Sequence, residues 1–182
     1  MKRTLLILAT LLLTVLAHAQ HMVYDTNVRT LQVTLNDNPL LPPVLKLGKS
    51  SFLRISWDEM SHDYHRYVYR IQHCTRYWEP TEDLFESDYL HGTNGLPVED
   101  YETSFNTTQL YTHYSLTFPN RDASVLLSGN YKLLVYEEDF MDNGPIIEVR
   151  FHVVEAEMGL TMQVSSNTDI DFNDKHQQVS LN

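Results

Sequence analysis

Two histidines and two acidic residues lie close together where one predicted strand ends and the next begins. Asp58 and Glu59 precede His62 and His65, and imidazole and carboxylate groups are common zinc ligands. A histidine pair three residues apart converges when it lies on one face of a helix, but a strand is predicted to begin near His65. The two rings are therefore expected to diverge, which favours solvated loop residues over a metal site.

A second candidate metal site lies in residues 169–173, whose alternating acidic pattern is typical of the start of a calcium-binding loop. Ile170 and Phe172 alternate within this segment as they would in a strand. The positions for the required glycine and glutamate hold Asp174 and Ser180. The sequence therefore predicts no metal site and no cofactor.

Cys74 is the one cysteine of the chain and adjoins His73. Neighbouring residues of a strand point to opposite faces, so a Cys–His nucleophilic pair is not expected. No GxSxG, HExxH, phosphate-binding glycine loop or paired-cysteine motif occurs either. We expect a non-enzymatic protein in which Cys74 is a buried thiol, with an intermolecular disulfide as the alternative.

Aromatic residues are abundant, with eleven tyrosines and two tryptophans, and such rings can stack on sugars. Trp57, Tyr67 and Tyr69 occupy the apolar phase of predicted strands, so we expect them in the core. Trp78 lies in a predicted loop, where its ring is either exposed or packed under the loop. A carbohydrate-binding or surface-adhesion module is therefore the alternative function.

The elements that position these residues are predicted to be β-strands, because apolar residues recur at every second position along most of the chain. The clearest runs contain Leu31, Val33 and Leu35; Leu53, Ile55 and Trp57; Tyr67, Tyr69, Ile71 and His73; Tyr114, Leu116 and Phe118; Tyr131, Leu133 and Val135; and Ile147, Val149, Phe151 and Val153. About seven short strands separated by turn residues predict an all-β protein, an antiparallel β-sandwich of immunoglobulin or fibronectin type III shape.

Two connections can be described further from the sequence. Residues 81–88 have helical character, with about two turns after Pro80 and Thr81 as the N-terminal cap. Residues 137–145 form an acidic connection that ends in Asn143, Gly144 and Pro145, and such residues stop strands. We expect this connection to join the last two strong strands as a hairpin.

The N-terminus has the features of a cleaved export signal. Lys2 and Arg3 precede an apolar run at residues 5–16, and Ala17 and Ala19 supply the small residues that signal peptidase requires. The run is shorter than the roughly 20 residues that span a bilayer, so no membrane span is predicted. We predict a signal peptide at residues 1–19, a sandwich domain at residues 20–157, and a linker with the start of a second module at residues 158–182.

The charge balance excludes one class of partner. The chain has 13 Lys and Arg against 24 Asp and Glu, a formal net charge of −11, and its basic residues are scattered. Nucleic-acid binding requires clustered cations that neutralise phosphates. We therefore expect no nucleic-acid partner, and a soluble, monomeric protein after export.

Several short motifs then occur in an order known from one family. They are Tyr67-Val68-Tyr69-Arg70-Ile71-Gln72-His73-Cys74 followed by Trp78, Asp88-Tyr89-Leu90, Tyr111-Thr112-His113-Tyr114 with Pro119-Asn120, Ser128-Gly129-Asn130-Tyr131 with Val135-Tyr136, and His176-Gln177-Gln178. This set resembles the N-terminal domain of the plug protein of the Bacteroidetes type IX secretion system. The chain departs from the family at Thr75-Arg76-Tyr77, where an Asn and an Asp are more usual.

The resemblance implies a periplasmic, non-catalytic protein associated with the outer membrane. Its implied partner is the outer-membrane translocon barrel, whose pore it seals from the periplasmic side. For this contact we expect the loops of residues 78–96, with the partner-binding candidates Trp78, Tyr89, His91 and Asn94. The other signature residues are expected to be structural: Tyr69, His73, Cys74, Thr112, His113, Tyr114, Gly129, Asn130 and Tyr131.

Overall fold

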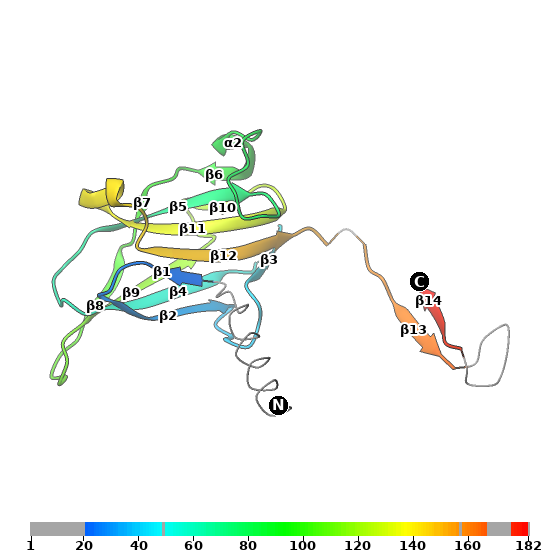
Figure 1. Cartoon of the computed structure of the whole chain (residues 1–182), viewed down its shortest axis with the longest axis horizontal. Coiled ribbons are helices and arrows are strands. Elements are labelled where there is room, and N and C mark those ends of the chain that lie inside the picture. Colours follow the sequence, from blue (N-terminus) through cyan, green and yellow to red (C-terminus); the bar gives the residue numbers. More distant parts are fainter. Residues whose placement is uncertain (1–20, 49, 157, 167–175, 182) are drawn as a thin grey trace, which may run out of the picture.

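The computed structural model describes residues 21–48, 50–156, 158–166 and 176–181. Two β-sheets pack face to face in the main body, and a separate hairpin follows it along the chain (Figure 1). The predicted signal peptide at residues 1–19 and the calcium-loop-like segment at residues 169–173 lie outside the described residues.

The first sheet has four antiparallel strands. Their spatial order is β2 (Val28–Leu35), β4 (Leu53–Glu59), β9 (Thr112–Phe118) and β8 (Asp100–Thr103). Strands β4 and β9 both alternate strictly between buried and half-buried residues, as their sequence pattern predicts. We call this sheet the four-stranded sheet.

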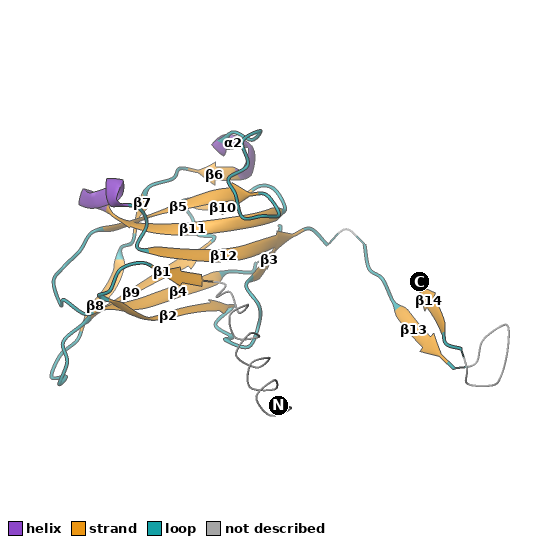
Figure 2. Cartoon of the chain, in the orientation of Figure 1, coloured by secondary structure: helices purple, strands orange, loops and turns teal. Residues whose placement is uncertain are grey.

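The second sheet is larger, and we call it the six-stranded sheet. Its spatial order is β1 (His21–Val23), β12 (Ile147–Val154), β11 (Gly129–Glu137), β5 (Tyr67–Cys74) and β7 (Leu96–Pro97), with β3 (Val44–Lys46) parallel to β12. The two strand orders match the sheets of an immunoglobulin-type sandwich (Figure 2). The predicted fold class is therefore confirmed.

The core between the sheets is built largely of aromatic rings. Trp57 and Tyr114 stack with their ring centroids 5.5 Å apart, and the Tyr67 ring meets Tyr114 edge-on at 4.8 Å. Tyr131 and Phe151 stack at 5.5 Å on the facing sheet. Such offset and edge-on contacts add to the large apolar area that these side chains bury. The expectation that Trp57 and Tyr67 belong to the core is confirmed.

The helical segment is shorter than the sequence suggests. The α2 helix spans Glu86–Tyr89 only, because the residues before it continue along the edge of the six-stranded sheet. Pro80 forms a β-bridge with Cys74, and the Thr81 amide donates a hydrogen bond to the His73 carbonyl. Beyond α2, β6 (Leu90–Gly92) pairs with β10 (Ala123–Val125).

The expected hairpin between the last two strong strands is present. Strands β11 and β12 pair in antiparallel register from Gly129↔Val153 to Val135↔Ile147. The acidic connection between them contains the 3-10 helix η1 (Glu138–Asn143), which ends at Gly144 with a positive φ of 90°. Glycine adopts this backbone conformation without steric cost.

The second hairpin pairs β13 (Met162–Ser165) with β14 (Gln178–Leu181), and Figure 1 shows it apart from the sandwich. Its register places Val164 opposite Val179 and Met162 opposite Leu181. These four apolar side chains share one face and are all more than half exposed. A two-stranded hairpin of this kind is marginal by itself in water.

The separation of this hairpin predicts that the sandwich folds without it. A chain that ends after Ala156 should have a melting temperature within about 2 °C of that of residues 20–182, because the truncation removes no core side chain. Differential scanning calorimetry checks this. A large drop in the melting temperature would mean that the hairpin supports the sandwich in solution.

Candidate functional site at one end of the sandwich

Four chain segments meet at one end of the sandwich, and we call this region the loop end. They are residues 24–27 between β1 and β2, residues 60–66 between β4 and β5, residues 104–111 between β8 and β9, and the η1 connection at residues 138–146. Figure 2 shows them along the left end of the molecule, from the η1 helix (Glu138–Asn143) at the top to the β8–β9 connection at the bottom. In an immunoglobulin-type sandwich, loops that cluster in this way commonly carry binding sites.

A buried carboxylate lies beneath these loops. Glu59 continues the inward phase of β4 after Trp57, so the strand carries its side chain into the interior, where it is 2% exposed. Its carboxylate accepts hydrogen bonds from the Ser61 amide at 2.9 Å and from the Ser61 hydroxyl at 2.7 Å. A buried carboxylate is costly unless it is paired or hydrogen-bonded, and these contacts offset that cost.

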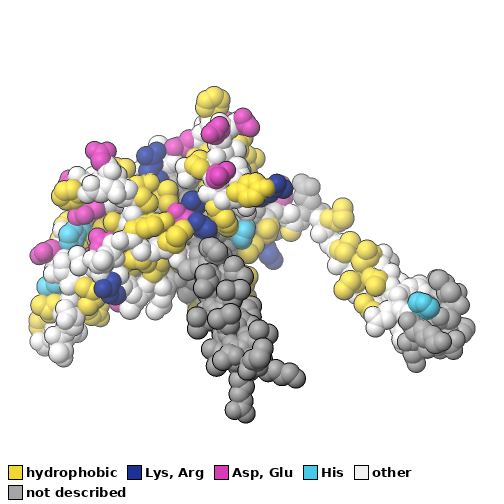
Figure 3. Space-filling model, in the orientation of Figure 1, with side chains coloured by type: hydrophobic (Ala, Val, Ile, Leu, Met, Phe, Trp, Pro, Cys, Tyr) yellow, Lys and Arg dark blue, Asp and Glu magenta, His cyan; other side chains and the backbone are white. Residues whose placement is uncertain are grey.

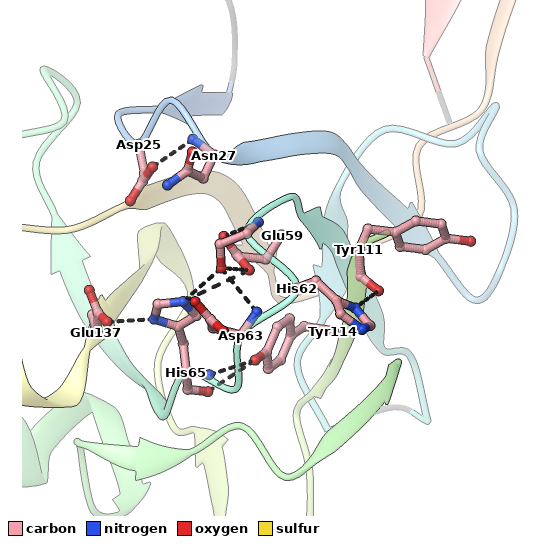
Figure 4. Close-up of polar contacts among 10 residues, drawn as sticks. Asp25, Asn27, Glu59, His62, Asp63, His65, Tyr111, Tyr114 and Glu137 are labelled. Carbon is pink, nitrogen blue, oxygen red and sulfur yellow. Dashed lines mark hydrogen bonds and ion pairs between the residues drawn. The ribbon is translucent and has the colours of Figure 1, made fainter. Parts of the chain in front are cut away.

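His65 links Glu59 to the other sheet (Figure 4). Its Nδ1 atom lies 2.7 Å from Glu137 Oε1 at the end of β11, and its Nε2 atom lies 3.1 Å from Ser61 Oγ and 3.9 Å from Glu59 Oε2. The imidazole therefore bridges carboxylates from the four-stranded and the six-stranded sheets. We call Glu59, Ser61, His65 and Glu137 the histidine clamp.

The order Ser61, His65, Glu137 is that of a nucleophile, a base and an orienting acid, but the shortest contact of the serine is to a different group. The single proton of the Ser61 hydroxyl has two neighbouring acceptors, Glu59 Oε2 at 2.7 Å and His65 Nε2 at 3.1 Å, and the shorter distance favours the carboxylate. An activated serine must instead donate to the histidine that takes its proton. The arrangement holds the 60–66 loop in place between the sheets.

Two tyrosine side chains of the core contact His65 of the histidine clamp. The Tyr114 hydroxyl donates to the His65 carbonyl and accepts from the His65 amide, both at 3.1 Å. The Tyr67 ring stacks on the His65 ring at 5.9 Å. Burial and the neighbouring Glu59 raise the pKa of Tyr67, so its phenol stays neutral.

His62 and His65 have different partners in this region. His62 Nδ1 lies 3.3 Å from the Tyr111 carbonyl oxygen, on the opposite side of the loop from the clamp (Figure 4). Across the part of the chain that the structure describes, no three His, Cys, Asp or Glu side chains are placed to hold a metal ion. Within the same residues, no helix is long and apolar enough to cross a membrane.

Cys74 lies away from the loop end, at the far end of β5, and is buried. Its Sγ atom contacts the Gln72 carbonyl at 3.7 Å. Burial raises the pKa of this thiol, which leaves little thiolate at neutral pH.

Cys74 should therefore react slowly with alkylating reagents. We expect iodoacetamide labelling at pH 7.5 to be at least about tenfold slower in the folded protein than in the same protein unfolded by guanidinium. Intact-mass spectrometry over time measures both rates. Equal rates would mean that the thiol is accessible and reactive in the folded state.

The partner-binding candidates differ in how far they reach solvent. The Trp78 ring is half-buried on the outer face of the six-stranded sheet, under the Arg150 guanidinium at 5.3 Å and beside His152. Tyr89 is buried. His91 is exposed on β6, and the Asn94 side chain is hydrogen-bonded to both the amide and the carbonyl of Ile71. Trp78 and Asn94 thus have contacts within the fold.

The signature residues on the central strands also have partners inside the fold, apart from the Thr112 hydroxyl, which has none among the described residues. His73 Nδ1 bonds the Thr81 hydroxyl at 2.8 Å, and burial lowers the His73 pKa. Gly129 has a φ of 149°, and a Cβ atom there would lie 2.4 Å from His73 Nε2. The remaining contacts join Tyr69 to Asn120, His113 to Asp58, Asn130 to Thr75 and His152, and Tyr131 to Leu127, while Thr112 is fully buried.

The fold and its loop end define the class of this protein: a β-sandwich module with loops and a clamped interior at one end, in which the described residues form no metal cluster. The chain belongs to the family of the type 9 secretion system plug protein 1st domain, whose model matches residues 28–155. The matched range covers nearly all of the sandwich.

A solved structure agrees with this assignment. A hypothetical protein from Parabacteroides merdae is 34% identical and superimposes with a TM-score of 0.73 over 91% of this chain. The chain spans 41% of that protein, so the relative is more than twice as long as the matched part. No curated protein matches the chain.

Proposed function

We propose that this protein docks on the periplasmic side of an outer-membrane translocon barrel and seals its pore when no substrate passes. Family membership over residues 28–155 is the observation that carries this proposal, because it associates the chain with the plug of a type 9 secretion system. The export-signal pattern at residues 1–19 supports a periplasmic location.

The physical character of the sandwich fits a sealing role. A plug must keep its shape while it occupies a pore. Interdigitated sheets with an aromatic core resist compression. Docking must also be reversible, which favours a surface of modest area over an obligate interface.

Affinity capture tests the proposed partner. Residues 20–182 with a C-terminal tag, added to a detergent extract of outer membranes from a bacterium with this secretion system, should retain the translocon barrel. An unrelated immunoglobulin-type sandwich of similar negative charge is the matched control. Failure to retain the barrel, together with specific signals on a glycan array, would favour a carbohydrate-binding module instead.

A further inference from the structure

The loop end carries most of the exposed aromatic side chains of the sandwich. They come from separate connections: Tyr24 follows β1, Tyr64 lies between β4 and β5, Phe105 lies between β8 and β9, and Phe140 lies in η1. Their exposed fractions run from 54% for Tyr24 to 85% for Phe105. On β8, the Tyr101 ring packs against Tyr64 at 5.0 Å. Exposed aromatic residues concentrated at one end of a molecule are typical of protein interfaces.

The same region is strongly acidic. Asp63, Glu102, Asp139 and Asp142 are exposed around the aromatic rings, and Figure 3 shows acidic side chains beside hydrophobic ones at this end. Arg66 is the one Lys or Arg in the four connections, and its guanidinium lies 2.9 Å from Glu138. The net negative potential attracts a positively charged surface and repels an anionic one.

A depression between the residue 24–27 turn and η1 combines both features. Its volume is about 190 Å³, and the residues that line it include two aromatic ones, Tyr24 and Phe140, and two acidic ones, Asp25 and Glu137. Small-molecule sites are larger, at roughly 300 Å³ or more. The depression therefore fits one side chain, and aromatic walls with carboxylates suit a Lys or Arg side chain.

The histidine clamp gives this surface a rigid base. His65 joins the 60–66 loop to Glu137, which is also a wall of the depression. A surface that is already ordered before binding loses less conformational entropy on association.

We propose that the loop end is the docking surface for a protein partner that presents Lys or Arg side chains beside aliphatic ones. One basic side chain enters the depression between Tyr24 and Phe140, and Phe105 and Tyr64 pack on the aliphatic surface around it. This inference rests on the proposed function, in which the partner is the translocon barrel, and it places the contact away from Trp78 at the other end of β5.

Binding of the purified barrel to immobilised residues 20–182 tests this surface. The triple variant Tyr64→Ala, Phe105→Ala and Phe140→Ala should raise the Kd roughly tenfold or more, because aromatic anchors dominate interface energetics. Its melting temperature should stay near that of the wild type, since all three side chains are exposed. The matched control, Tyr77→Ala with Phe85→Ala and Leu126→Ala, removes exposed apolar side chains outside the loop end and should leave the Kd unchanged.

Salt dependence tests the charge of the partner. Raising the salt concentration from about 0.05 to about 0.5 M should weaken wild-type binding, and Asp139→Asn with Asp142→Asn should flatten this dependence. Unchanged binding by the loop-end triple variant, or a loss caused by the control instead, would overturn the inference and leave the plug function standing. Absence of wild-type binding would overturn the plug function itself.

Discussion

Replacing His65 with alanine should lower the free energy of unfolding by about 2–3 kcal/mol. The change removes the group that lies between Glu59 and Glu137, and among the described residues it leaves the buried Glu59 carboxylate with Ser61 as its hydrogen-bond partner. Removing one neighbour of a buried carboxylate costs more than the contact itself contributes, because the carboxylate stays desolvated with fewer polar partners.

Guanidinium denaturation of the wild type and the variant measures this difference. His113→Ala is the matched control, because His113 pairs with Asp58 at 2.6 Å on a more exposed part of the same region. An exposed pair of this kind contributes at most about 1 kcal/mol. If His65→Ala lowered the free energy of unfolding by no more than His113→Ala does, the histidine clamp would not hold the two sheets together.

Replacing Trp57 with alanine should have the largest effect on stability, a loss of about 3–5 kcal/mol. The Trp57 ring is fully buried and contacts Tyr114 by stacking and Tyr67 edge-on. Removing it leaves a cavity at the centre of the aromatic core, and the surrounding rings cannot collapse fully into that space.

Trp57→Phe separates the apolar contribution from any polar one. The indole nitrogen has no hydrogen-bond partner among the described residues. The change to phenylalanine therefore removes buried apolar area but no hydrogen bond. We expect a loss of about 1–2 kcal/mol for this variant in the same denaturation experiment. An equally severe loss for phenylalanine and alanine would show that the indole makes a contact beyond packing.

The alternation of apolar residues was sufficient to predict the sandwich. Strands β4 and β9 alternate over their whole length, and each inward residue points into the core. A one-residue shift would turn the whole set to solvent, so such a pattern specifies both the strand and its buried face. The helix after Pro80 was predicted too long, because pairing of Pro80 with Cys74 is a tertiary contact that local pattern does not contain.

Only part of the histidine clamp could be predicted from the sequence. Glu59 continues the alternation of Leu53, Ile55 and Trp57 by one step, so its inward direction could have been predicted, and a buried acid requires a partner. Its link to Glu137 depends on residues 78 positions apart on facing sheets. The exposed aromatic side chains of the loop end come from four connections in the same way, and only the folded chain brings them together.

The proposed sealing role is tested most directly by the conductance of the translocon barrel in a planar lipid bilayer. Adding residues 20–182 on the periplasmic side should lower the open-pore current in a saturable manner, and addition on the opposite side should have no effect. An unchanged current at a concentration that saturates binding would contradict a plug function for this chain.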